Sequence, residues 1–115
     1  MVDQLFAMKT YSTRCCHVIE LAGELDMSTA PQVQDQLASY LVMPEHLLVD
    51  ITGLDFMDST GLKVLLEAHR LVEGRMSLVG PTPQVQRLLE LAGTANVLHV
   101  SPDRATARSH LHTAA

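Results

Sequence analysis

The segment Asp58-Ser59-Thr60-Gly61 holds the residues of this chain whose types and spacing are best suited to chemistry. A serine hydroxyl can act as a nucleophile, cap a helix, or accept a phosphate from another enzyme. An apolar pattern of helical period follows directly, with Leu62, Leu65 and Leu66 on one face. The segment is therefore predicted to open a helix, with Ser59 exposed at its start.

Local pattern alone favours the simplest role, in which Asp58 or Ser59 accepts hydrogen bonds from free N–H groups of the first helical turn. A catalytic serine would need a base and an oxyanion hole, and the segment lacks the Gly-x-Ser-x-Gly elbow. The chain also has no glycine-rich phosphate loop. We therefore expect that the chain is not itself an enzyme.

Composition narrows the classes of partner. The 115 residues carry a net charge of -5, with 3% aromatic residues and no Trp, which argues against nucleic acid as a partner. No stretch approaches the length of a membrane span, and Met1–Gln4 has an acid where a signal peptide needs positive charge. We expect a soluble, cytoplasmic protein without a bound cofactor.

Strand-like and helix-like segments alternate along the chain, which indicates an α/β domain. Strands are predicted over residues 5–11, 16–21, 46–51, 76–79 and 97–100, and helices over 30–41 and from 59, 83 and 101 onward. Residues 23–31 are predicted to form a turn that runs into a helix, and residues 52–57 a loop. Right-handed crossovers give a largely parallel sheet of about four to five strands.

The cysteines and histidines have simple interpretations. Cys15 and Cys16 are the only cysteines, and adjacent residues of a strand point to opposite faces, so we expect one buried thiol, one exposed thiol and no disulfide between them. A redox role is left open. Among six histidines, His110 and His112 form the only close pair, in a tail expected to fray, so no metal site is predicted. His69 is expected to be partly buried and hydrogen-bonded.

Four stretches in register resemble one protein family. The segment Leu54–Leu62 resembles the phosphorylation segment of bacterial anti-sigma factor antagonists, the STAS-domain proteins. Leu21–Asp26 resembles the family's strand-to-helix turn, Leu48–Ile51 its central strand, and Pro83–Gly93 its third helix. The resemblance covers residues 5 to 112 and implies a single STAS domain spanning residues 1–115.

The resemblance also implies a function. In this family the unphosphorylated antagonist binds an anti-sigma factor that is also a serine kinase, which frees the sigma factor. The kinase phosphorylates the serine after the Asp, here Ser59, and a PP2C-type phosphatase reverses the reaction. The chain itself is expected to be a monomer or weak dimer. The implied partner-binding residues are Asp26, Asp58, Ser59, Thr60, Gly61 and Lys63.

Lys63 departs from the family pattern, because many relatives carry a small residue there, often glycine. It is either a solvated lysine, or a residue that pairs with the phosphate or tunes partner choice. The runner-up function also stays open: a STAS scaffold or subunit of a stress-sensing or lipid-transport complex that does not act on a sigma factor.

The expected switch is electrostatic and local. Phosphorylation adds about -1.5 to -2 charges, and a helix N-terminus stabilises an anion by roughly 0.3 to 2 kcal/mol. A unit charge about 6 Å away costs roughly 3 kcal/mol at an effective dielectric near 20. Because these terms nearly cancel within the free protein, we expect no refolding and a large effect only at a partner surface.

Overall fold

A five-stranded sheet organises the computed structural model, which describes residues 6–113, with side chains through residue 109. The strands lie in the order β1-β2-β3-β4-β5. β1 (Ala7–Ser12) is antiparallel to β2 (Cys16–Leu25), and β3 (His46–Met57), β4 (Met76–Val79) and β5 (Val100–Ser101) continue the sheet in parallel. The predicted mixed, largely parallel sheet is confirmed.

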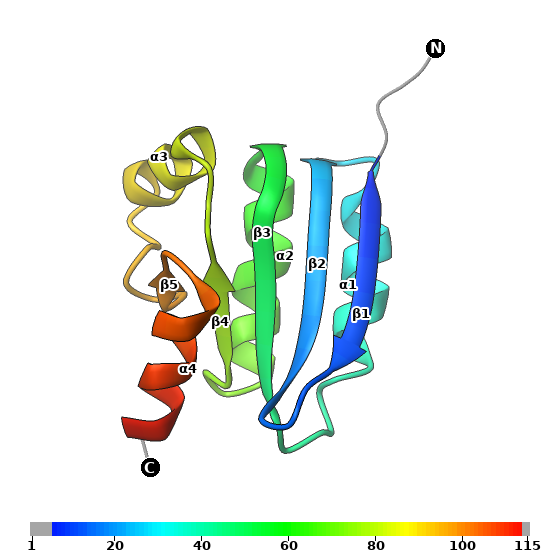
Figure 1. Cartoon of the computed structure of the whole chain (residues 1–115). Coiled ribbons are helices and arrows are strands. Elements are labelled where there is room, and N and C mark those ends of the chain that lie inside the picture. The colour runs from blue at the N-terminus through cyan, green and yellow to red at the C-terminus, as the bar shows by residue number, and fades with distance from the viewer. Residues whose placement is uncertain (1–5, 114–115) are drawn as a thin grey trace.

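Four helices accompany the sheet in the described residues: α1 (Ala30–Ala38), α2 (Ser59–Leu71), α3 (Pro83–Leu91) and α4 (Arg104–Thr113). In Figure 1, α1 and α2 lie behind the sheet, α4 lies in front of it, and α3 sits near its upper end. The first three helices begin where the sequence predicts. The last begins later than Ser101, because the Asp103 carboxylate accepts the Thr106 N–H at 2.8 Å and so marks the helix start.

The two faces of the sheet differ in polarity. The rear face is apolar, and residues from β2, β3, α1 and α2 are fully buried there, including Ile19, Leu21, Ile51, Val33 and Leu65. Among the residues whose side chains are described, the front face holds a smaller buried cluster beneath α4, made of Cys16, Val18, Leu48, Val79 and Ala107. The main hydrophobic stabilisation therefore comes from the rear layer, on which the start of α2 is positioned.

β3 is longer than predicted, because residues 52–57 are strand and not loop. β3 advances from Asp50 to Gly53 while β2 advances only from Glu20 to Ala22, and a second shift follows near residue 55. Each irregularity inserts one extra residue into β3. The buried positions Ile51, Leu54 and Met57 are consequently three residues apart, so the segment lacks the alternation of period two that identifies a strand.

The predicted strand at 97–100 is also wrong in its bounds. β5 contains only Val100 and Ser101, and the preceding residues form turns in which the Leu98 N–H donates to the Thr94 carbonyl at 3.0 Å. Leu98 is fully buried, whereas Val97 is 51% exposed. Residues 97–99 are therefore apolar in part but not extended. One of them, Leu98, is buried in a turn, and His99 has a left-handed backbone (φ 53).

Cys15 and Cys16 are joined by a disulfide, contrary to the prediction. The prediction assumed that both residues lie in a strand. β2 begins at Cys16, and Cys15 belongs to the hairpin turn that connects β1 to β2 at the lower edge of the sheet in Figure 1. Strand alternation therefore does not apply to the pair, and the turn lets the two sulfur atoms meet.

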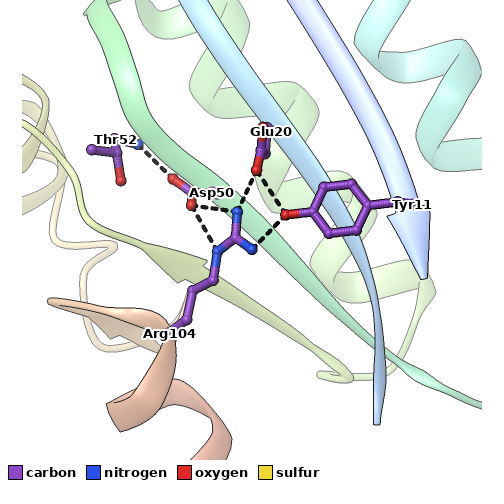
Figure 2. Close-up of polar contacts among 5 residues, drawn as sticks. All are labelled: Tyr11, Glu20, Asp50, Thr52 and Arg104. Atoms are coloured by element: carbon purple, nitrogen blue, oxygen red, sulfur yellow. Dashed lines mark hydrogen bonds and ion pairs between the residues drawn. The ribbon is translucent and has the colours of Figure 1, made fainter. Parts of the chain in front are cut away.

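A polar network on the front face connects α4 to three strands (Figure 2). The Arg104 guanidinium donates to Asp50 Oδ2 at 2.9 Å and Glu20 Oε2 at 2.6 Å, and it also donates to the Tyr11 hydroxyl. Tyr11 donates in turn to Glu20, and the Thr52 N–H donates to Asp50. Burial opposes the charge on Arg104, but these hydrogen bonds outweigh it and raise the pKa of the guanidinium.

We predict that Arg104→Met lowers the free energy of unfolding by about 1–3 kcal/mol, less than for a fully buried pair because the Arg104 side chain is 28% exposed. Glu20 and Asp50 are partners in the sheet register, so removal of the guanidinium leaves two neighbouring carboxylates unneutralised. Urea unfolding measures the loss. Adding Glu20→Gln to Arg104→Met should recover part of it, and no recovery would contradict the electrostatic cause.

His46 gives the stability a pH dependence. Its Nε2 lies 3.1 Å from the Ser77 hydroxyl, and burial, together with the charges of His99 and Arg75, lowers the pKa of His46 to about 4. The unfolded chain takes up this proton near the ordinary pKa of about 6.5. Since the unfolded state binds more protons between these two values, the folded protein loses stability as the pH falls through this window.

We predict that wild type loses about 1–2 kcal/mol more stability than His46→Gln between about pH 7.5 and about pH 5. The variant serves as the control because it retains the carboxylates and the other histidines, and only the difference between the two proteins reports on His46. Urea unfolding at both pH values measures it. Equal losses in the two proteins would show that His46 does not carry this dependence.

Candidate partner-binding site

The candidate site lies where β2 and β3 end side by side. Leu25 pairs with Met57 in the parallel register, and the Asp58 N–H donates to the Leu25 carbonyl at 3.2 Å. Asp26 and Asp58 each follow one of these paired residues, so two acidic residues stand at neighbouring strand ends, at the upper edge of the sheet in Figure 1. The tertiary structure thus brings together two acidic residues, Asp26 and Asp58, that are far apart in sequence.

Asp58 caps α2, as one of the two predicted candidates. Its carboxylate accepts the N–H of Gly61 at 3.0 Å, while Ser59 begins the helix. The Asp58 carboxylate satisfies one N–H group of the first turn. The N-terminus of α2, where Ser59 lies, therefore keeps a partial positive charge.

Gly61 is buried and sets how closely α2 approaches β2. A Cβ atom at this position would lie 2.7 Å from Leu25 Cγ, 2.8 Å from the Leu25 carbonyl oxygen and 3.0 Å from Met57 Cγ. Such distances do not occur for real Cβ atoms without displacement of a neighbour. Packing therefore requires glycine at position 61. Its predicted contribution to the partner surface would be indirect, because Gly61 sets the position of α2.

Asp26 organises the turn from β2 into α1. Its carboxylate accepts the Ser28 hydroxyl at 2.8 Å, the Ser28 N–H at 3.0 Å and the Thr29 N–H at 3.3 Å. The Thr29 hydroxyl also donates to the Glu24 carbonyl at 2.8 Å. The Ser28 hydroxyl bond, followed by the backbone bonds, holds the pKa of Asp26 below its usual range. Asp26 is consequently an ordered negative charge at this edge.

Ser59 is exposed, as predicted. Among the side chains of residues 6–109 its hydroxyl has no hydrogen-bond partner, so the oxygen is free to react with another protein's active site. Ser59 and Thr60 line a shallow hollow of about 290 Å³ together with Leu62, Lys63 and Leu66. Lys63 is exposed one helical turn beyond Ser59, on the same side of α2.

Two exposed apolar residues near this edge were not predicted as site residues from the sequence. Met27 follows Asp26 in the turn and is 73% exposed, and Phe56 precedes the cap by two residues and is 39% exposed. Exposed apolar and aromatic side chains are typical anchors of protein interfaces. The available signal was Met27 itself, an apolar residue inside the otherwise polar run Asp26–Thr29.

Three further features concern groups that the sequence singled out for metal or nucleophile chemistry. Among the side chains described, those of residues 6–109, no group of three or more His, Cys, Asp or Glu is arranged to hold a metal ion. A cleft of about 760 Å³ is lined by residues such as Thr52, Gln86 and Ser101, and does not include Ser59. His69 is partly buried as predicted, but its buried Nε2 has no hydrogen-bond partner there, contrary to expectation.

Comparison with known proteins assigns the family. Residues 7–107 match the STAS domain model. The chain is 30% identical over 99 residues to the anti-sigma F factor antagonist of Paenibacillus polymyxa, covering 82% of this chain and 85% of the relative. The chain therefore belongs to the STAS-domain family, in the group whose members are named anti-sigma factor antagonists.

Solved structures share the fold. A crystal structure of an anti-sigma factor antagonist from Mycobacterium paratuberculosis superposes with a TM-score of 0.86 at 22% identity, covering 94% of this chain and 95% of that one. The Bacillus cell fate determinant SpoIIAA in its phosphorylated form superposes with a TM-score of 0.66 at 22% identity, covering 93% and 99%. No helix in the described part of the chain is both long and apolar enough to cross a membrane.

Proposed function

We propose that this chain is an anti-sigma factor antagonist that binds an anti-sigma factor with serine kinase activity and is released when that kinase phosphorylates Ser59. A PP2C-type phosphatase would restore binding. The observation that carries the proposal is the exposed, unbonded Ser59 hydroxyl at the first position of α2, beside the ordered acidic residues Asp26 and Asp58.

Accessibility supports the role of Ser59 as a phosphoacceptor. A kinase must reach the hydroxyl oxygen with the terminal phosphate of its nucleotide, and Ser59 is exposed on the hollow that it shares with Lys63. The first turn of α2 would stabilise the product, because backbone N–H groups at a helix start favour a phosphate. Free antagonist could therefore hold the phosphoserine without unfolding.

Charge supports release of the partner. The phosphate would join Asp26 and Asp58 at one edge of the sheet, where Asp58 already uses its carboxylate to cap the helix. In water this added charge is screened, but a partner surface pressed against it excludes water and ions. An uncompensated dianion in that interface would cost several kcal/mol, and each 1.4 kcal/mol weakens binding tenfold.

The exposed residues around Ser59 would also contact the partner. Met27 and Phe56 would supply apolar contacts, and Asp26, Thr60 and Lys63 would form the polar rim around Ser59. This arrangement follows the usual anatomy of an interface, with apolar anchors inside and charged groups at the periphery.

The test mixes purified chain with candidate anti-sigma factors from the same genome and ATP, then maps phosphate by mass spectrometry. We expect phosphate on Ser59 in wild type and in Thr60→Ala, and none in Ser59→Ala. Thr60→Ala is the matched control, because it removes the neighbouring hydroxyl of the same helical turn.

Two outcomes would contradict different parts of the proposal. Binding to an anti-sigma factor without any phosphate on Ser59 would leave an antagonist but remove the switch. No binding to any anti-sigma factor, with capture of subunits of a transporter or stress complex instead, would replace the antagonist with a scaffold function.

A further inference from the structure

Cys15 and Cys16 form a bonded pair far from the candidate partner-binding site. They lie where the hairpin turn enters β2, whereas Leu25 at the other end of the ten-residue strand contacts the cap of α2. A strand of this length spans about 30 Å. The disulfide is therefore not part of the Ser59 site, and its role has to be found in its own surroundings.

The bond contributes little to folding by constraining the chain. It joins adjacent residues, so it closes the smallest loop that a disulfide can close, and such a loop removes almost no entropy from the unfolded state. A structural disulfide would be expected to connect distant segments. A chemical role is the better explanation of this pair.

The two cysteine residues differ in accessibility. Cys16 is 2% exposed and packs in the front-face cluster with Val18 and Ala107. Cys15 is half-buried at the margin of the same cluster, and the hydroxyl of Thr13 lies 3.7 Å from its sulfur atom in the hairpin turn. A reagent from solution would therefore reach Cys15 more readily than Cys16.

We propose that Cys15 and Cys16 are a reversible dithiol–disulfide site, in which Cys15 reacts first with a small disulfide of the glutathione type and Cys16 resolves the product. Exposed Arg14 places a positive charge beside Cys15 in the same turn, and glutathione disulfide is anionic, so attraction between them favours encounter at this thiol.

The reaction balances without another reagent. The Cys15 thiolate attacks one sulfur of glutathione disulfide, forms a mixed disulfide and releases one glutathione thiolate. The Cys16 thiolate then attacks the Cys15 sulfur, forms the Cys15–Cys16 bond and releases the second glutathione. The two protein thiols lose two protons and two electrons, and glutathione disulfide takes them up as two thiols. A small dithiol such as dithiothreitol reverses the sequence.

The experiment treats fully reduced protein with glutathione disulfide, stops the reaction by alkylation and measures intact mass over time. Wild type should lose both free thiols without accumulating a glutathione adduct. Cys16→Ala should accumulate one persistent adduct on Cys15. Cys15→Ala should form an adduct about tenfold more slowly or worse, because its remaining thiol is buried.

The two alanine variants are matched, since each removes one sulfur atom and adds no polar group to the front-face cluster. Circular dichroism checks that both are folded before their rates are compared. Three results would overturn the proposal: a stable adduct on wild type, equal adduct rates in the two variants, or wild-type thiols that stay reduced with excess glutathione disulfide.

Discussion

Ser59→Asp should bind its anti-sigma factor about 2–3 kcal/mol more weakly than wild type, or roughly 30- to 150-fold in Kd. The carboxylate adds one negative charge at the first position of α2, at the strand edge that already carries Asp26 and Asp58. The Ser28 hydroxyl and neighbouring N–H groups hold the pKa of Asp26 low, so that carboxylate remains ionised and does not relieve the repulsion. Isothermal titration calorimetry with the purified anti-sigma factor measures the change.

Ser59→Asn is the matched control, because its side chain has nearly the shape of Asp but no charge. We expect it to bind within a few-fold of wild type, as Ser59→Ala also should. If Asn and Asp weaken binding equally, size and not charge is responsible, and the electrostatic switch is wrong. If neither weakens binding, Ser59 lies outside the interface.

A second large effect is expected at Gly61. Gly61→Ala should lower the free energy of unfolding by about 1–3 kcal/mol, although alanine is the better helix former by up to about 1 kcal/mol. The new methyl group would overlap Leu25 Cγ and the Leu25 carbonyl oxygen, and the backbone oxygen cannot rotate away. α2 would therefore have to move off the end of β2 and carry Ser59 with it.

Urea unfolding measures the loss at Gly61, and Thr60→Ala provides the comparison because it changes the same helical turn without adding an atom. Thr60→Ala should change stability by less than about 0.5 kcal/mol. Binding of the anti-sigma factor should also weaken in Gly61→Ala, because the displaced helix misplaces the contact residues. A Gly61→Ala protein as stable as Thr60→Ala would show that the close approach of α2 to Leu25 is not a constraint.

Local rules were sufficient for the elements with strong periodicity. The faces of α1 and α2 follow residues three and four apart, so their burial on the rear of the sheet follows from sequence. The continuous apolar run at Leu47–Val49 similarly predicts a strand buried on both faces, which the structure confirms. The exposed Ser59 follows from the same local chemistry, which left Asp58 and Ser59 as alternative caps until the structure showed Asp58 in that role.

The error over residues 52–57 arises because pairing between strands changes the local pattern of burial. Residues 52–57 have no alternation because the register with β2 inserts extra residues into β3, and only the partner strand reveals this. The prediction of no disulfide is wrong for another reason. It rests on strand geometry, which does not apply to Cys15 because that residue precedes β2 by one position. The bounds of a strand therefore depend on its pairing partners, which are distant in the sequence.

The sequence by itself determined that this protein offers an exposed serine at a helix start, because helix capping and apolar periodicity act over a few residues. The tertiary structure decided what surrounds that serine. Parallel pairing of β2 with β3 brings Asp26 beside Asp58, and only the packing against Leu25 shows why residue 61 has no side chain. Such contacts join residues more than thirty positions apart, so no local pattern can encode them.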